Sequence, residues 1–323
     1  MMYKKILDAF PPPNFLNIPY VGISISDSFV RSIKFGRNNR SLFVEKFSEK
    51  AIPRGIVEGG RINDTEGLVK ILKEIKKEMN AKYARVSLPE EKAYLFETEI
   101  PHVVKEEIRS TIEFKIEENV PLKVAEVDFD YVITEQNRQT GNLTVVVSAL
   151  PAKAVDAYAE AVSKAGISLL SLEIVSQAVA RALLPYGTRE ANLILHFGLD
   201  KVGLYVVSSG IVSFTSTVST KGENLSNRNF LLGEIKRVCG YWDTLKENEG
   251  KKEKQIQRIV ICGEGIESDL VSYLTANQKV SVVLGNVWQN AFDVNDVVPP
   301  ISFTDSIKFA PAIGLALPEE ILI

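Results

Sequence analysis

Cysteine and histidine are both scarce in this chain of 323 residues. The two cysteines, Cys239 and Cys262, form no CxxC motif and have no histidine within a few residues. The sequence therefore argues against a disulfide framework or a zinc site and favours a reducing compartment. The two histidines, His102 and His196, are too few for a histidine-based metal site. We assign no catalytic residue and no metal ligand from the sequence.

Long apolar runs and an excess of basic charge are absent as well. No segment approaches about 18 consecutive apolar residues, so no transmembrane helix is expected. Residues 1–19 carry basic side chains but lack the apolar region and cleavage site of a signal peptide. We expect this tail to pack on the body of the protein. The net charge of −3 gives no reason to expect a nucleic acid as the main partner.

The chain contains an internal repeat of long period. Residues 20–46 read as three short strands joined by tight turns. Residues 192–218 repeat this pattern of strand, turn, strand and strand. In the alignment of the two copies Ile23 matches Leu195, Ile25 matches Phe197, Ser26 matches Gly198 and Val30 matches Val202. A repeat at this period predicts two similar domains rather than a solenoid of short units.

The segment between the two copies predicts a helix and then a compact inserted unit. The helix covers residues 64–80, with Asp64 as its N-cap. The elements that follow are strands at 84–88 and 93–99, a helix with the stripe Val104, Ile108, Ile112 and Ile116, strands at 127–134 and 143–149, and a helix at 153–164 closed by Gly166. This order predicts a β-α-β-β-α subdomain over residues 86–167.

The predicted fold class is therefore α/β with two duplicated domains. The first domain comprises residues 1–85 and 168–190, and the inserted subdomain interrupts it. The second domain comprises residues 191–323 and includes a long helix at 225–245, whose apolar face carries Ile235, Val238 and Trp242. A strand at 256–262 ends in Gly263-Glu264-Gly265 and leads to another helix.

The order of these pieces resembles the actin, sugar kinase and Hsp70 superfamily. In that superfamily two ribonuclease-H-like domains clamp a nucleotide, and the resemblance implies that both hairpin turns hold phosphates through backbone N–H groups. It also implies that the Gly-x-Gly turn approaches adenine and ribose, because glycine lets the backbone come close.

Within the superfamily the chain resembles the type IV pilus assembly protein PilM family over some 300 residues. The inserted subdomain is then of the type found in FtsA. The matching segments, in order, are VGISISDSFVRSIKF, IPHVVKEEIRSTIEFKIEENVPLKVAEVDFDYVI, AGI followed by LEIVSQAVARAL, GEIKR, IVICGEGIE and FAPAIGLAL. Six such segments in the right order make the resemblance specific.

The resemblance implies a set of nucleotide-binding residues. They are Ser24, Ser26, Asp27 and Ser28 at the first turn, Gly198 at the second, Lys221 and Gly222 near a phosphate, Glu234 and Arg237 near ribose and base, and Gly263 and Gly265 at adenine. Three of these groups have a structural alternative. The first turn is also typical of an ordinary Ser/Asp-rich hairpin. Glu234 and Arg237 also fit a solvated ion pair. The two glycines also fit the geometry of a helix entry.

Two departures from the family pattern concern magnesium. The family's hairpins carry Asp-Ile-Gly, whose aspartates face the nucleotide-bound magnesium, whereas this chain has Ser24 and His196 at those positions. A hydroxyl and an imidazole are poor substitutes for two carboxylates around magnesium. Asp27 and Asp200 lie on the turns, where they would compensate only if the turns were re-formed. The resemblance implies ATP with magnesium as the ligand, and these departures predict binding without turnover. We expect His196 to be a structural histidine.

The function that the resemblance implies is that of a cytoplasmic scaffold in type IV pilus assembly. A groove formed by the inserted subdomain and its flank would bind the N-terminal cytoplasmic segment of a PilN-like inner-membrane protein and so hold the chain at the membrane without insertion. Other pilus-machine subunits are further candidate partners. The candidate groove residues are Leu88 and Pro89, Ile100 and Pro101, and Val120 and Pro121.

Three other functions remain open on this fold. An active ATPase or small-molecule kinase would need the aspartates that are missing. A filament-forming relative of FtsA would be expected to end in a linker and an amphipathic helix, whereas this sequence ends in PEEILI after its closing helix. The cytoplasmic part of a secretion-system L-type protein would be expected to continue into a transmembrane helix.

Overall fold

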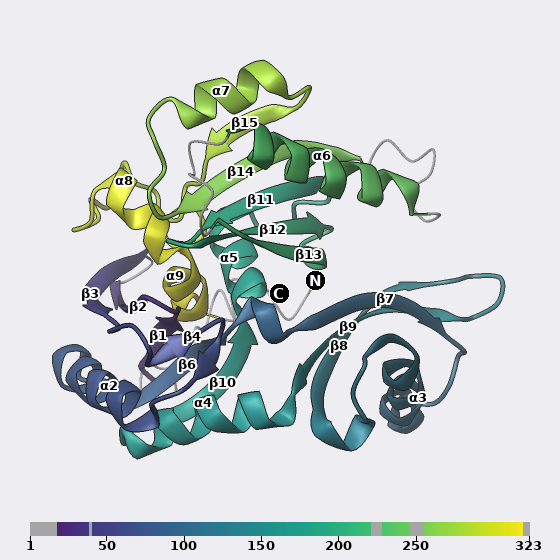
Figure 1. Cartoon of the computed structure of the whole chain (residues 1–323), viewed down its shortest axis with the longest axis horizontal. Helices are drawn as coiled ribbons and strands as arrows, with labels where there is room; N and C mark the ends of the chain where they lie inside the picture. The colour runs from purple at the N-terminus through teal and green to yellow at the C-terminus, as the bar shows by residue number, and fades with distance from the viewer. Residues whose placement is uncertain (1–17, 39–40, 221–227, 246–254, 319–323) are drawn as a thin grey trace.

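The computed structural model describes residues 18–38, 41–220, 228–245 and 255–318, and two five-stranded sheets dominate it (Figure 1). The first sheet has the order β10-β6-β1-β2-β3, from Ser168–Ile174, Tyr83–Leu88, Tyr20–Ile25, Phe29–Asn38 and Ser41–Ala51. The second has the order β13-β12-β11-β14-β15, from Ile211–Ser219, Lys201–Ser208, Ala191–Phe197, Ile256–Gly263 and Ser281–Leu284.

The two sheets have the same topology and the same register. In each, three antiparallel strands come first and two further strands then run parallel to the first one. Ile25 pairs with Val30 in the first hairpin, and Phe197 pairs with Val202 in the second. These are the positions that the alignment of the two repeats matched, so the predicted duplication is confirmed residue for residue.

The inserted elements follow the predicted β-α-β-β-α order. They are β7 (Tyr94–Ile100), α3 (Lys105–Asn119), β8 (Val127–Gln136), β9 (Leu143–Pro151) and α4 (Ala152–Lys164). The strands form a separate sheet, β7-β9-β8, with α3 packed on one face through Ile108, Ile112 and Ile116. Val104, predicted as part of that stripe, precedes the helix and is exposed.

Helix α4 packs on the first domain rather than on the inserted sheet. Its buried residues Tyr158, Ala161 and Val162 join the core under α2 (Thr65–Met79), which begins at the predicted cap, where Gly67 N donates to Asp64 Oδ1 (3.0 Å). The short strands β4 (Val57–Glu58) and β5 (Arg61–Ile62) pair beyond the first sheet and were not predicted.

Two helices lie between the two large sheets (Figure 1). They are α5 (Val175–Leu183) and α9 (Ala310–Ala316), and they share one apolar cluster with Ile33 from the first sheet and Val260 from the second. The outer face of the first sheet is covered by α2 and α4. The outer face of the second is covered by α6 (Arg228–Thr244) and α7 (Leu270–Asn277).

The predicted long helix corresponds to α6, with Ile235, Val238 and Trp242 buried as expected. Its predicted start at residue 225 and the tail at residues 1–17 lie outside the described residues. Two short helical turns, α8 (Phe303–Ser306) and η5 (Ile307–Phe309), lead into α9. No helix within the described ranges combines the length and hydropathy needed to cross a bilayer.

The α9 layer depends on close backbone approach. A Cβ at Gly314 would overlap the carbonyl oxygen of Ala178 in α5, and a Cβ at Gly22 in β1 would overlap the carbonyl oxygen of Ala312. Small residues at these positions therefore let α9 lie against both a strand and a helix, and this contact fixes the distance between the two sheets.

We predict that Gly314→Ala lowers the free energy of unfolding by about 2–4 kcal/mol, because the added methyl group must displace backbone rather than side chain. Urea unfolding monitored by circular dichroism measures the change. Gly240→Ala is the matched control, since nothing lies near its Cβ position on the exposed face of α6. It should stabilise the protein by about 0.5–1 kcal/mol. Equal effects of the two substitutions would contradict this packing.

Candidate functional site

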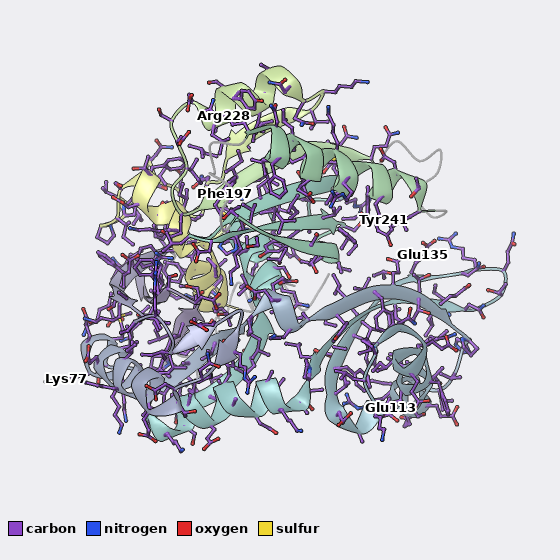
Figure 2. The ribbon with its side chains drawn as sticks, in the orientation of Figure 1. Lys77, Glu113, Glu135, Phe197, Arg228 and Tyr241 are labelled. Carbon is purple, nitrogen blue, oxygen red and sulfur yellow. The ribbon has the colours of Figure 1, made fainter. Side chains whose placement is uncertain are left out.

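The candidate site is the cleft where the two duplicated hairpins face each other. Figure 2 marks Phe197 at the end of β11, where the second turn begins. The cleft encloses about 90 Å³, and predicted residues from both halves line it. These are Ser24, Ser26, Asp27 and Ser28 from the first half and Gly198 and Gly263 from the second. The structure therefore brings together the predicted turns and the start of the Gly-x-Gly segment.

The other predicted residues lie elsewhere or outside the described part. Arg237 Nη1 pairs with Glu234 Oε2 at 3.0 Å on α6, where the Glu234 side chain is buried and that of Arg237 is 74% exposed. Neither residue lines the cleft, nor does Gly265, which has a φ of +58°. The position of the pair favours the ion-pair alternative. Lys221 and Gly222 fall outside the described residues.

The first turn uses its own N–H groups internally. The Ser26 hydroxyl accepts hydrogen bonds from the N–H groups of Ser28 (3.3 Å) and Phe29 (3.0 Å). The Ser26 N–H itself donates to the Phe29 carbonyl (2.9 Å). These are the bonds of an ordinary serine turn, and they occupy donors that a phosphate would need.

Gly263 has a structural reason to be glycine. Its φ is +107°, and a Cβ there would overlap the carbonyl oxygen of Phe197, which also accepts a hydrogen bond from Glu264 N (2.8 Å). The end of β14 therefore lies directly beside the end of β11, with which it pairs in parallel. This close approach explains the glycine without an adenine ring nearby.

The first cluster of charges in the cleft surrounds Lys201, at the start of β12. Its ammonium Nζ lies 3.1 Å from Asp27 Oδ2 on the first turn and also contacts Glu91 Oε1. Asp27 in turn accepts hydrogen bonds from the N–H groups of Gly59 (3.1 Å) and Gly60 (3.0 Å). Burial lowers the pKa of Lys201, but the carboxylates of Glu91 and Asp27 outweigh it and raise that pKa above its ordinary value.

The second cluster of charges surrounds Arg31 of β2. Its guanidinium contacts Glu264 Oε1 in the second half, and its Nε lies 2.5 Å from Glu49 Oε2 on β3. The Arg31 side chain is 9% exposed, and its Nη1 also donates to the carbonyl of Lys308 (3.3 Å). The charge of Arg31 is therefore balanced within the protein.

Two further titratable groups lie deep in the cleft. Glu90 Oε2 accepts a hydrogen bond from the N–H of Ser176 in the first turn of α5 (3.0 Å), and burial raises the pKa of Glu90 to about 7 although that hydrogen bond opposes the rise. His196 Nδ1 lies 3.3 Å from the Tyr205 hydroxyl. Burial lowers the pKa of His196 to about 4, and the charges of Lys201 and Arg31 act in the same direction.

Five residues that line the cleft were not predicted from the sequence: Arg31, Glu90, Glu91, Lys201 and Glu264. One signal was available for the acidic pair, because Glu90 and Glu91 follow the carboxyl end of β6, a parallel strand next to β1. Side chains at that edge of a sheet of this kind commonly form binding sites. The partners of Arg31 and Lys201 lie far away in sequence and left no local pattern.

The residues present do not fit a magnesium-bound nucleotide. The cleft encloses about 90 Å³, below the roughly 300–1,000 Å³ of pockets for ligands of this size, and it adjoins a more open cavity of about 430 Å³ that is lined by four of the same acidic side chains. The lining carries three basic side chains, Arg31, Lys201 and Lys308, against five acidic ones, Asp27, Glu90, Glu91, Asp200 and Glu264. An acidic excess repels phosphates. Among the residues described, no group of three or more His, Cys, Asp or Glu is placed to hold a metal ion.

Comparison with solved structures places this fold among known ones. The chain is similar to a structure titled "PilM-PilN type IV pilus biogenesis complex", with 18% sequence identity and a TM-score of 0.77 over 93% of this chain and 98% of that one. It is also similar to the cytoplasmic domain of EpsL, an inner membrane component of the type II secretion system of Vibrio cholerae. That match has 12% identity and a TM-score of 0.47, and covers 85% of this chain and all of the other.

A third similar structure is MreB 5 of Spiroplasma citri bound to AMPPNP, with 11% identity and a TM-score of 0.49, over 94% of this chain and 96% of that one. A comparison with curated protein sequences finds no match.

Two sheets of identical topology, joined across α5 and α9 with their first hairpins facing each other, define a protein of the actin-like class. The predicted fold class, including the inserted β-α-β-β-α unit, is confirmed. The model of the family described as "Type IV pilus assembly protein PilM" matches residues 22–230, more than half of the chain. The chain belongs to this family.

The opposite pKa shifts of Glu90 and His196 predict that their effects on stability nearly cancel between pH 5 and 8. Because the pKa of Glu90 is raised, its contribution to the free energy of unfolding is fully present below pH 4.5 and is lost as the pH rises through about 7. The lowered pKa of His196 gives stability that is complete above pH 6.5 and is lost as the pH falls toward about 4.

Single substitutions should reveal how each of the two groups makes the free energy of unfolding depend on pH. We expect Glu90→Gln to lose about 1–2 kcal/mol of unfolding free energy between pH 8 and pH 5, because only the His196 effect remains. His196→Gln should instead gain a similar amount over the same change. Urea unfolding at pH 5, 6.5 and 8 measures both. Parallel pH profiles for the two variants would contradict the burial of these groups.

Proposed function

We propose that this chain is a scaffold of type IV pilus assembly that binds the N-terminal cytoplasmic segment of a PilN-like inner-membrane protein. Membership of the PilM family supports a role in type IV pilus assembly, and the similar solved structure is of a PilM-PilN complex. The observation that carries the proposal is a groove between the inserted sheet and α5, enclosing about 860 Å³. The partner holds the scaffold at the inner membrane, on its cytoplasmic side.

The walls of the groove suit an extended peptide. One wall is β8, an outer strand of the β7-β9-β8 sheet, and the opposite wall is α5 with the loop that follows it. The turn between β12 and β13 closes one end with Ser209, Gly210 and Ile211. An extended segment that pairs with an outer strand gains main-chain hydrogen bonds, while its side chains enter pockets on alternate sides.

The lining offers both apolar anchors and fixed charges. The apolar residues are Val132, Ala180, Leu184, Val207, Ile211 and Val212. Arg181 is held in place, because its guanidinium lies 2.5 Å from Glu173 Oε2 and donates to the carbonyl of Gly314 (3.1 Å). Val132 is 46% exposed and needs no rearrangement to reach a ligand.

The groove residues proposed from the sequence were wrong in part. Leu88 is buried in the core of the first sheet, while Ile100 and Val120 are buried in the core under α3. These side chains face two separate interiors, so they cannot form one docking surface without unfolding. The groove instead uses the opposite face of the inserted sheet, through Asp130 and Val132.

The alternative of an active ATPase or kinase has less support. Ser24 and His196 stand where such enzymes need carboxylates, and the cleft residues are paired with one another. The scaffold role needs no turnover, because the groove lies outside the cleft. Contacts with further pilus-machine subunits would extend the same role.

The first test is binding of a synthetic peptide with the N-terminal cytoplasmic sequence of the PilN-like protein from the same organism. Titration calorimetry should show a Kd in the micromolar range, about −8 kcal/mol. Val132→Glu should weaken binding at least about tenfold, because it places a charge on an apolar wall of the groove.

Val298→Glu is the matched control, since Val298 is 88% exposed and does not line the groove. It should leave the affinity unchanged. Equal weakening by both substitutions, or no binding of the peptide to the wild-type chain, would overturn the proposed docking site.

A further inference from the structure

The duplicated turns of the cleft carry opposite charges at complementary positions. In each turn the N–H of the first residue donates to the carbonyl three residues on: Ser26 to Phe29 (2.9 Å) and Gly198 to Lys201 (2.8 Å). The two turns therefore superpose position by position. Yet the first turn presents an anion, Asp27, where the second has Leu199. The second presents a cation, Lys201, where the first has Phe29.

This asymmetry joins the two halves directly. Lys201 reaches from the second sheet to Asp27 and Glu91, which both belong to the first half of the molecule. Arg31 reaches in the opposite direction, from the first sheet to Glu264 after β14. The pairing is reciprocal, because each half supplies one cation that pairs with carboxylates of the other half.

Neighbouring groups also hold the members of these ion pairs in position. The two Asp27 oxygens accept hydrogen bonds from the backbone of Gly59 and Gly60, so the carboxylate has a fixed position. The guanidinium of Arg31 lies 4.6 Å from the centre of the Phe29 ring and is also paired with Glu49. Removing one partner of a fixed and half-buried pair of this kind costs more than removing one partner of a flexible surface pair, because the other charge is left without compensation.

We propose that the Lys201–Asp27–Glu91 and Arg31–Glu264 ion pairs are a built-in clamp that closes the cleft with the chain's own cations, so that closure needs no bound nucleotide or metal. The clamp fills the place between the two turns where a ligand would have to bridge them. The apolar layer of α5 and α9, which lies between the sheets and borders the cleft through Val175 and Pro311, acts as the hinge. The clamp is separate from the partner groove and does not depend on it.

Hydrogen exchange measured by mass spectrometry on the full chain tests this clamp. Lys201→Met removes the charge and keeps most of the side chain's length. We expect exchange at both turns, residues 26–29 and 198–201, to become at least about tenfold faster than in the wild type. The segment at residues 263–264, a separate part of the cleft wall, should also exchange faster, because the whole cleft opens. Lys201→Arg should restore slow exchange.

Lys164→Met is the matched control. Lys164 also pairs with two carboxylates, Glu160 (2.8 Å) and Glu66 (3.9 Å), but all three groups lie on the first half. This variant should exchange like the wild type in the cleft. Glu91→Gln is a second clamp variant that keeps Lys201 in place, and it should also speed exchange in the cleft.

The salt dependence of hydrogen exchange is an independent test of the clamp. Raising NaCl from about 0.1 M to about 1 M shortens the screening length from about 10 Å to about 3 Å. Exchange in the cleft of the wild type should therefore accelerate, while that of Lys201→Met should change less, because only the Arg31–Glu264 pair is left to be screened. The clamp is overturned if Lys201→Met exchanges no faster than Lys164→Met, or if only residues 198–201 are affected.

Discussion

The close stacking of α9 between β1 and α5 is the contact on which the rest of the structure depends. Gly22 and Gly314 leave no room for side chains at the two crossings. The two large sheets are therefore held at a fixed separation by backbone contact and by one shared apolar cluster. Because the sheets are duplicates, this spacing also places their first hairpins opposite each other. The cleft is a consequence of that packing.

The duplicated halves have acquired different surfaces around this common frame. At the turns, one copy presents Asp27 and the other Lys201, and the two charges meet. Deeper in the cleft, Glu90 caps the first turn of α5 and His196 approaches Tyr205. These side chains fill the interior of the cleft with protein groups. The inserted sheet lies to one side and forms a larger groove with α5. The proposed partner groove and the proposed clamp therefore lie on different surfaces of one molecule, with α5 adjoining both.

Much of the fold could be predicted because its signals are local or repeated. The alignment matched Ser26 with Gly198, which begin equivalent turns in the structure, and the stripe of Ile108, Ile112 and Ile116 located α3. The packing of α4 on the first domain could not be predicted, since its apolar face looks the same whichever core it covers.

The site was harder to predict for a physical reason. Turn residues such as Asp27 and Gly198 are visible as turns, and they do line the cleft. What the cleft does depends on the partners of Arg31 and Lys201, which are distant in sequence. The apolar residues beside prolines, such as Ile100, suggested a surface groove but are buried in cores.

Titration calorimetry of Mg-ATP and the partner peptide into the wild-type chain, in both orders, tests the central claim most directly. That claim is that the cleft closes through its own charges while the groove does the binding. It predicts heat from the peptide, no heat from Mg-ATP at millimolar concentration, and the same peptide affinity with and without nucleotide. Tight binding of Mg-ATP, or peptide binding that appears only after ATP, would contradict it.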